Sequence, residues 1–183
     1  KRSMYGATKD IDDINNNGDT TDVYSKASDK IVINSVVSSY QDTTTYVQTD
    51  KSNYSTGVVN ASYDSDYEYK LRVRTGSADV TNLILYTNIE EGHNGRGHWK
   101  GKFLGMDTTY AESKGYKIKT YYSENTNAMS MKEDNSWKEY NDSIDKSKVK
   151  SLAFVFQDGE GKPAVLPANS LTYILIKMKA PSN

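Results

Sequence analysis

The residues best suited to ligand chemistry lie in an acidic segment near the start of the chain. Asp13, Asn15, Asn17 and Asp19 place oxygen-bearing side chains at alternate positions, with a glycine before the last of them. This spacing lets a tight loop fold its oxygens around a hard cation, as calcium loops do. The twelfth position of such a loop is Tyr24, which offers no bidentate carboxylate. Two interpretations stay open: a structural Ca²⁺ site and a solvated turn.

The only two histidines, His93 and His98, flank a glycine-rich loop at residues 90–97. Two imidazoles and a neighbouring carboxylate can bind a metal, but three glycines leave the geometry of the ligands undefined. We expect a hairpin tip here. A long exposed loop also suits recognition of a partner, so His93 and His98 are candidate ligand-binding residues.

The two tryptophans differ in their surroundings. Trp99 alternates in phase with Phe103, which favours packing in a core. Trp137 lies in a polar stretch, residues 135–140, where an exposed indole face can stack on a sugar ring. Trp137 is therefore a candidate for binding a glycan.

The sequence shows little that is typical of a catalytic site. No Gly-x-Ser-x-Gly segment is present, and the adjacent acids Glu90 and Glu91 would point apart on a strand. No glycine-rich phosphate loop follows a strand and opens a helix. We expect no enzymatic activity.

Composition narrows the class of protein further. The chain has 183 residues, 15 of them tyrosine, and a net charge of −1, so nothing favours nucleic acid or an anionic membrane as partner. No apolar run is long enough to insert into a bilayer. Cysteine is absent, which excludes disulfides and thiolate chemistry and is frequent in bacterial surface proteins.

The elements that must position these residues are strands. Residues 67–74 alternate strictly, with Tyr67, Tyr69, Leu71 and Val73 on one face and charged residues on the other. Further strands are expected at 30–38, 43–49, 80–86, 98–104, 116–122, 149–156 and 171–178. Residues 107–114 can form a short helical turn that Gly115 would end.

This pattern predicts an all-β fold, an antiparallel sandwich of two sheets with at most one or two short helical turns. Residues 1–27 form a short acidic extension, a linker or ion-binding loop. Residues 28–183 form a single sandwich domain.

Three segments carry a resemblance to known proteins: residues 69–86, with a Gly-Ser turn followed by Val-Thr-Asn, and residues 105–116 and 165–173. Together they resemble the Ig-like repeats of Gram-positive, wall-anchored surface proteins and adhesins. The resemblance implies an Ig-like sandwich, extracellular display on a bacterial cell wall and neighbouring modules in one longer chain. Such modules sometimes carry a Lys–Asn isopeptide bond, for which Lys177 and Asn169 are the residues to examine.

The function expected from the residues and the resemblance is that of a structural or stalk repeat that displays neighbouring domains. The alternative is an adhesin module that binds a host protein or a glycan through exposed loops.

Overall fold

The structure of the chain is a computed structural model. It describes residues 7–9, 23–25, 41–89, 91–94 and 97–182. Strands dominate these residues, and every strand pairing is antiparallel. The all-β prediction is confirmed.

The chain divides into two compact units, residues 1–36 and 37–183. In the first unit, β1 (Ala7–Lys9) pairs with β2 (Val23–Ser25). The calcium candidates Asp13, Asn15, Asn17 and Asp19 and the strand expected at residues 30–38 lie outside the described residues.

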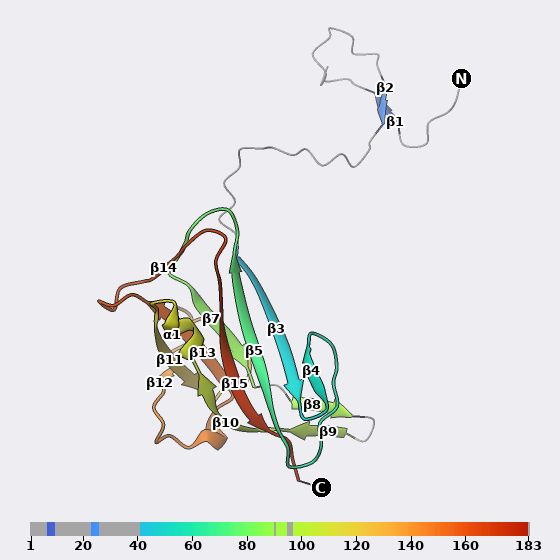
Figure 1. Cartoon of the computed structure of the whole chain (residues 1–183), viewed down its shortest axis with the longest axis vertical. Coiled ribbons are helices and arrows are strands. Elements are labelled where there is room, and N and C mark those ends of the chain that lie inside the picture. Colours follow the sequence, from blue (N-terminus) through green and yellow to red (C-terminus); the bar gives the residue numbers. More distant parts are fainter. Residues whose placement is uncertain (1–6, 10–22, 26–40, 90, 95–96, 183) are drawn as a thin grey trace. The chain divides into compact units, whose positions relative to one another are not determined.

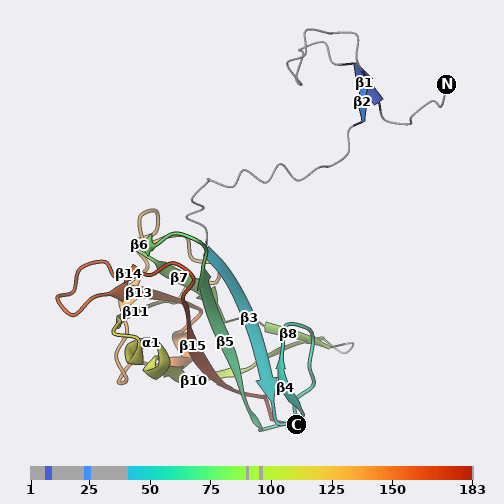
Figure 2. The ribbon, with the colours of Figure 1, turned by 45° about the horizontal axis from the view of Figure 1, so that its top comes forward.

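The larger sheet of the second unit contains five strands (Figure 1). Across this sheet the strands lie in the order β10 (Lys102–Asp107), β15 (Leu171–Lys179), β5 (Asp66–Thr75), β3 (Gln41–Thr49) and β4 (Ser52–Ser55). Both ribbon views show β3, β5 and β15 as long neighbouring strands (Figure 2). The late strand β15 therefore lies between strands that come much earlier in the chain.

The second large sheet has four strands. Their order is β12 (Lys138–Glu139), β11 (Lys117–Ser123), β13 (Ser151–Gln157) and β7 (Ile84–Asn88). Two short pairs complete the strands: β6 (Val80–Thr81) with β14 (Val165–Leu166), and β8 (Glu91–Asn94) with β9 (Gly97–Lys100). After β5 the chain crosses from one large sheet to the other at β7, at β10, at β11 and again at β15, as in Greek-key sandwiches.

The two large sheets share one hydrophobic core. Alternate residues of the central strands face it, because successive side chains of a strand point to opposite sides of the sheet. From the five-stranded sheet come Tyr67, Leu71, Val73, Phe103, Ile174, Ile176 and Met178; from the four-stranded sheet come Leu85, Leu152, Phe154 and Phe156. The antiparallel two-sheet sandwich is the predicted fold, and the alternation read from residues 67–74 gives the correct inner face of β5.

Two local predictions also hold. The short helix α1 (Thr109–Ser113) is followed by Gly115, whose φ of 90° lies in the left-handed region that favours glycine. A single 3₁₀ turn, η1 (Lys146–Lys148), is the other helical element among the described residues.

Two strand predictions need correction. The run at 80–86 is interrupted at Asn82, which has a φ of 57°, so β6 and β7 are separate strands in different sheets. The run at 98–104 is likewise divided at Gly101 into β9 and β10.

Candidate functional site

The chain enters and leaves the sandwich at opposite ends of β5. Gln41, the first residue of β3, lies opposite Thr75 at the end of β5, whereas Lys179, the last residue of β15, lies opposite Asp66 at its start. At 3.3–3.4 Å per residue, β5 separates these two ends by roughly 30 Å. Figure 1 shows the start of β3 and the C-terminal end on opposite sides of the sandwich.

Hydrogen bonds join the end of β5, beside which β3 begins, to the turn that precedes β15. The buried Thr75 hydroxyl donates to the Pro167 carbonyl (2.6 Å) and accepts from the Ser170 amide (2.8 Å). The Thr75 amide in turn donates to the Ser170 carbonyl at 3.0 Å. The last residue of β5 is thus bound to the turn that opens β15.

The opposite end is fastened by the residues that follow β15. The Ala180 amide donates to the Ser65 carbonyl (2.8 Å), and the Asp64 amide donates to the Pro181 carbonyl (3.1 Å). The Ser182 hydroxyl donates to the Asp64 carboxylate at 2.8 Å. These bonds extend the pairing of β15 with the β5 region beyond the strands themselves.

An aromatic and cationic row crosses the outer face of the five-stranded sheet. The Lys70 ammonium lies 3.6 Å from the ring centroid of Tyr54 and 4.9 Å from that of Tyr173. Tyr110 of α1 stacks on Tyr173 with centroids 3.9 Å apart. Each such cation–π contact contributes about 0.5–1 kcal/mol at an exposed site. The row therefore ties β4, β5, β15 and α1 together.

The hydroxyl of Tyr54 donates to the Glu68 carboxylate beside this row. Burial raises the pKa of the Tyr54 hydroxyl, and the hydrogen bond to Glu68 raises it further. Tyr54 consequently remains a neutral donor and does not act as a base. The row was not identified from the sequence, because only the pairing of distant strands brings Lys70 between two tyrosines.

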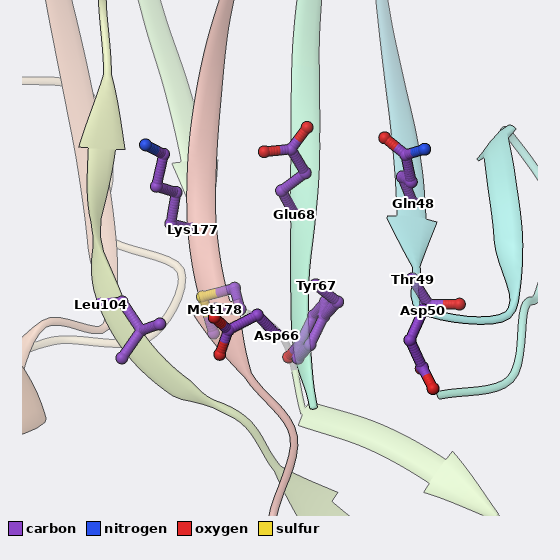
Figure 3. A pocket seen from close by; sticks show the side chains of 9 residues that line it. All are labelled: Gln48, Thr49, Asp50, Asp66, Tyr67, Glu68, Leu104, Lys177 and Met178. Atoms are coloured by element: carbon purple, nitrogen blue, oxygen red, sulfur yellow. The ribbon is translucent and has the colours of Figure 1, made fainter. Parts of the chain in front are cut away.

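An open depression of about 370 Å³ lies on the same sheet, at the end where β5 begins and β3 ends (Figure 3). Figure 3 shows Gln48, Glu68 and Lys177 projecting from three neighbouring strands, β3, β5 and β15. Glu68 already accepts from Tyr54, and Lys177 lies 3.7 Å from the Asp107 carboxylate. The depression offers polar contacts, but its central charged groups are already paired.

Asp50, at the rim of this depression, positions the loop that leads into β5. Its carboxylate accepts from the Ser62 amide (2.9 Å) and the Ser65 hydroxyl (3.0 Å). The hydrogen bonds from Ser62 hold the pKa of Asp50 below its usual value. This carboxylate therefore stays ionised and holds the loop in place.

Trp137 lies on the outer side of the four-stranded sheet, in contact with Tyr86. Their ring centroids are 5.6 Å apart, and the Trp137 indole nitrogen donates to the Met129 carbonyl at 2.8 Å. The Tyr86 hydroxyl accepts from the Met131 amide at 3.1 Å. Trp137 is only partly exposed, and these contacts fasten the segment before β12 to β7.

For the other candidate ligand-binding residues, His93 and His98, the structure describes the backbone pairing. The β8–β9 hairpin pairs His93 with His98 in the backbone register, within the region where the sequence predicts a hairpin tip. Among the side chains that the structure describes, no cluster of three or more His, Asp or Glu has the arrangement of a metal site.

The residues considered for an isopeptide bond do not meet in the sandwich core. The side chain of Lys177 is 52% exposed and lies on the outer face of β15. Asn169 is exposed in the turn before β15, with a φ of 56°.

No described helix has the length and apolar character needed to span a bilayer. Comparison with protein-family models, with curated proteins and with solved structures finds no match to this chain. Functional inference therefore starts from the geometry of the sandwich.

Proposed function

We propose that the chain is a non-catalytic module that separates and displays neighbouring parts of an extracellular protein on a bacterial cell surface. The observation that carries the proposal is that Gln41, where β3 begins, and Lys179, where β15 ends, lie at opposite ends of β5, roughly 30 Å apart. A module with this geometry lengthens a chain, whereas one whose ends lie together only adds a side branch.

Two further features support this role. Hydrogen bonds of Thr75 and of Asp64 hold the flanks of β15 to the two ends of β5, so the position of β15 along β5 is built into the folded sandwich. The resemblance of residues 69–86 to repeats of wall-anchored proteins favours the same setting.

Distance measurement tests the geometry. The chain has no cysteine, so Thr43→Cys with Ser182→Cys gives two unique sites for spin labels. We expect a separation of about 30–35 Å, because the two residues lie at opposite ends of β5. The matched pair Thr43→Cys with Leu171→Cys lies at one end, across one intervening strand, and should give about 10 Å. Equal separations in the two pairs contradict the proposal.

An experiment on cells tests whether the module separates and displays its neighbours. One, two and three copies of the full chain are placed between a wall anchor and a terminal epitope, and the height of the epitope is measured. Folded copies should raise it linearly, by at least about 30 Å each. Copies with Phe154→Asp, which places a charge at a fully buried core position, should unfold and follow a square-root dependence. No gain in height with native copies overturns the display role.

A second candidate function is adhesion to a host protein or glycan. The loop between β4 and β5 exposes Val58 completely, and Tyr63 is 61% exposed. Apolar side chains at a loop tip are suited to contact with a partner. On arrays of glycans and matrix proteins, binding that disappears in Tyr63→Ala without a change in melting temperature favours adhesion. Absence of any signal at high protein concentration removes this alternative.

A further inference from the structure

The first and last strands of the five-stranded sheet in chain order, β3 and β15, are held by one common partner. β3 and β15 both pair antiparallel with β5, one on each side, so they run parallel to each other. The β3 ladder runs from Gln41–Thr75 to Gln48–Glu68, and the β15 ladder from Leu171–Arg74 to Lys179–Asp66. Both ladders therefore occupy nearly the whole length of β5.

Tension between Gln41 and Lys179 would act along these ladders. A force at Gln41 draws β3 past the C-terminal end of β5, and a force at Lys179 draws β15 past its N-terminal end. Hydrogen bonds of an antiparallel pair lie perpendicular to the strands, so this force loads them all together in shear. A force applied to two strands at the same end would instead break the pairs one after another.

We propose that β3, β5 and β15 form a shear clamp that makes the sandwich resistant to tension applied between Gln41, the start of β3, and Lys179, the end of β15. The proposal deepens the display function: it adds that the module bears load. The clamp is defined by the strands Gln41–Thr49, Asp66–Thr75 and Leu171–Lys179.

Side chains on the inner face of the sheet oppose sliding of the strands. Leu71 and Val73 of β5 and Ile174 of β15 are buried in the shared core. A slip of one residue would turn these inner side chains to the outer face. The next register that restores the inner face lies two residues away, or roughly 7 Å. The ladders must therefore break before a new register can form.

Side chains on the outer face cross the same strands. Lys70 bridges Tyr54 of β4 and Tyr173 of β15. Arg72 donates to the Thr44 hydroxyl of β3 at 3.0 Å and lies 3.5 Å from the Asp42 carboxylate. These contacts join β5 to its neighbours on both sides, so they too are strained when β3 and β15 are drawn apart.

β15 is also held on its second side. β10 pairs with it from Lys102–Lys179 to Asp107–Leu175, with a bulge between Phe103 and Gly105. Drawing β15 out of the sheet thus shears two ladders, whereas the other neighbour of β3 is only the short strand β4. We expect rupture to begin at β3.

Single-molecule force spectroscopy of the full chain tests the clamp through the same cysteine pairs. The pair Thr43→Cys with Ser182→Cys applies force at opposite ends of β5, and Thr43→Cys with Leu171→Cys applies it at one end. At equal loading rate we expect a several-fold higher rupture force for the opposite-end pair. In both cases a single lengthening of roughly 450 Å should mark complete unfolding of the sandwich.

Equal rupture forces in the two geometries, or a lower force for the opposite-end pair, overturn the clamp. Such a result leaves the display function intact if the spin-label distances hold. If those distances fail, both proposals fall. Melting temperatures of the two unloaded variants provide the control, because a difference in force without a difference in thermal stability assigns the effect to direction.

Discussion

Replacing Trp137 by Ala distinguishes a structural tryptophan from a sugar-binding one. The substitution removes the ring contact with Tyr86, worth about 0.5–1.5 kcal/mol, and the hydrogen bond to the Met129 carbonyl, worth about 1 kcal/mol. Together with the loss of buried apolar area, these two losses should lower the free energy of unfolding by about 2–3 kcal/mol. For a chain of this size that lowers the melting temperature by roughly 5–10 °C.

Trp137→Phe is the matched control, because it keeps a ring against Tyr86 but loses the indole donor. We expect it to lower the melting temperature by about 2–4 °C, in proportion to one hydrogen bond. Thermal unfolding followed by circular dichroism measures both variants. If Trp137→Ala melts like the native chain yet loses binding on a glycan array, the structural interpretation is wrong and the indole is a ligand platform.

Three further outcomes follow from individual contacts, and a fourth from the spacing of the acidic residues 13–19. Gly101→Ala should destabilise the fold by about 1–3 kcal/mol in denaturant titrations, because its new Cβ would lie 2.0 Å from the Tyr67 hydroxyl oxygen. The loss should shrink in a Tyr67→Phe background, and an undiminished loss there refutes the clash. Thr172→Val should stabilise by about 1 kcal/mol, since the buried hydroxyl has no partner among the described residues; Thr172→Ser, which keeps the hydroxyl, should give no such gain. The hydrogen bond from Thr109 holds the pKa of Asp107 below that of an unfolded chain, so its stabilisation is present above about pH 4 and is lost as pH falls through the lowered value. Melting of Asp107→Asn should therefore depend less on pH between 5 and 2, and an unchanged pH profile contradicts this role. Finally, a Ca²⁺ site at residues 13–19 predicts a higher melting temperature in excess calcium than in chelator, and equal values exclude it.

The sequence predicts the strands well where polar and apolar residues alternate without ambiguity. Tyr67, Leu71 and Val73 face the core as the pattern of β5 requires, and Gly115 ends α1 as expected. β15 is different, because its apolar residues occupy both faces. Only the packing shows that Ile174 is inside and Tyr173 outside.

The candidate site was harder to predict for a related reason. Trp137 lies in a polar stretch, and polar neighbours give no sign that Tyr86, distant in sequence, lies against it. Lys70 likewise shows only that it alternates with apolar residues, whereas its place between Tyr54 and Tyr173 depends on strand order. The residue types along one strand therefore do not predict contacts that form between strands.

The same limit applies to the function proposed for the molecule. Its central feature is the pairing of β3 and β15 with β5, which joins segments more than a hundred residues apart in the chain. The residue types of these strands do not indicate which strands pair, because Thr, Tyr and Val suit any strand with one solvent-exposed face. What makes the arrangement useful is direction. Two parallel strands on either side of a third place the start of β3 and the end of β15 apart, and their hydrogen bonds lie across the line of tension. A load-bearing role can therefore reside in strand order alone, with no residue type that marks it.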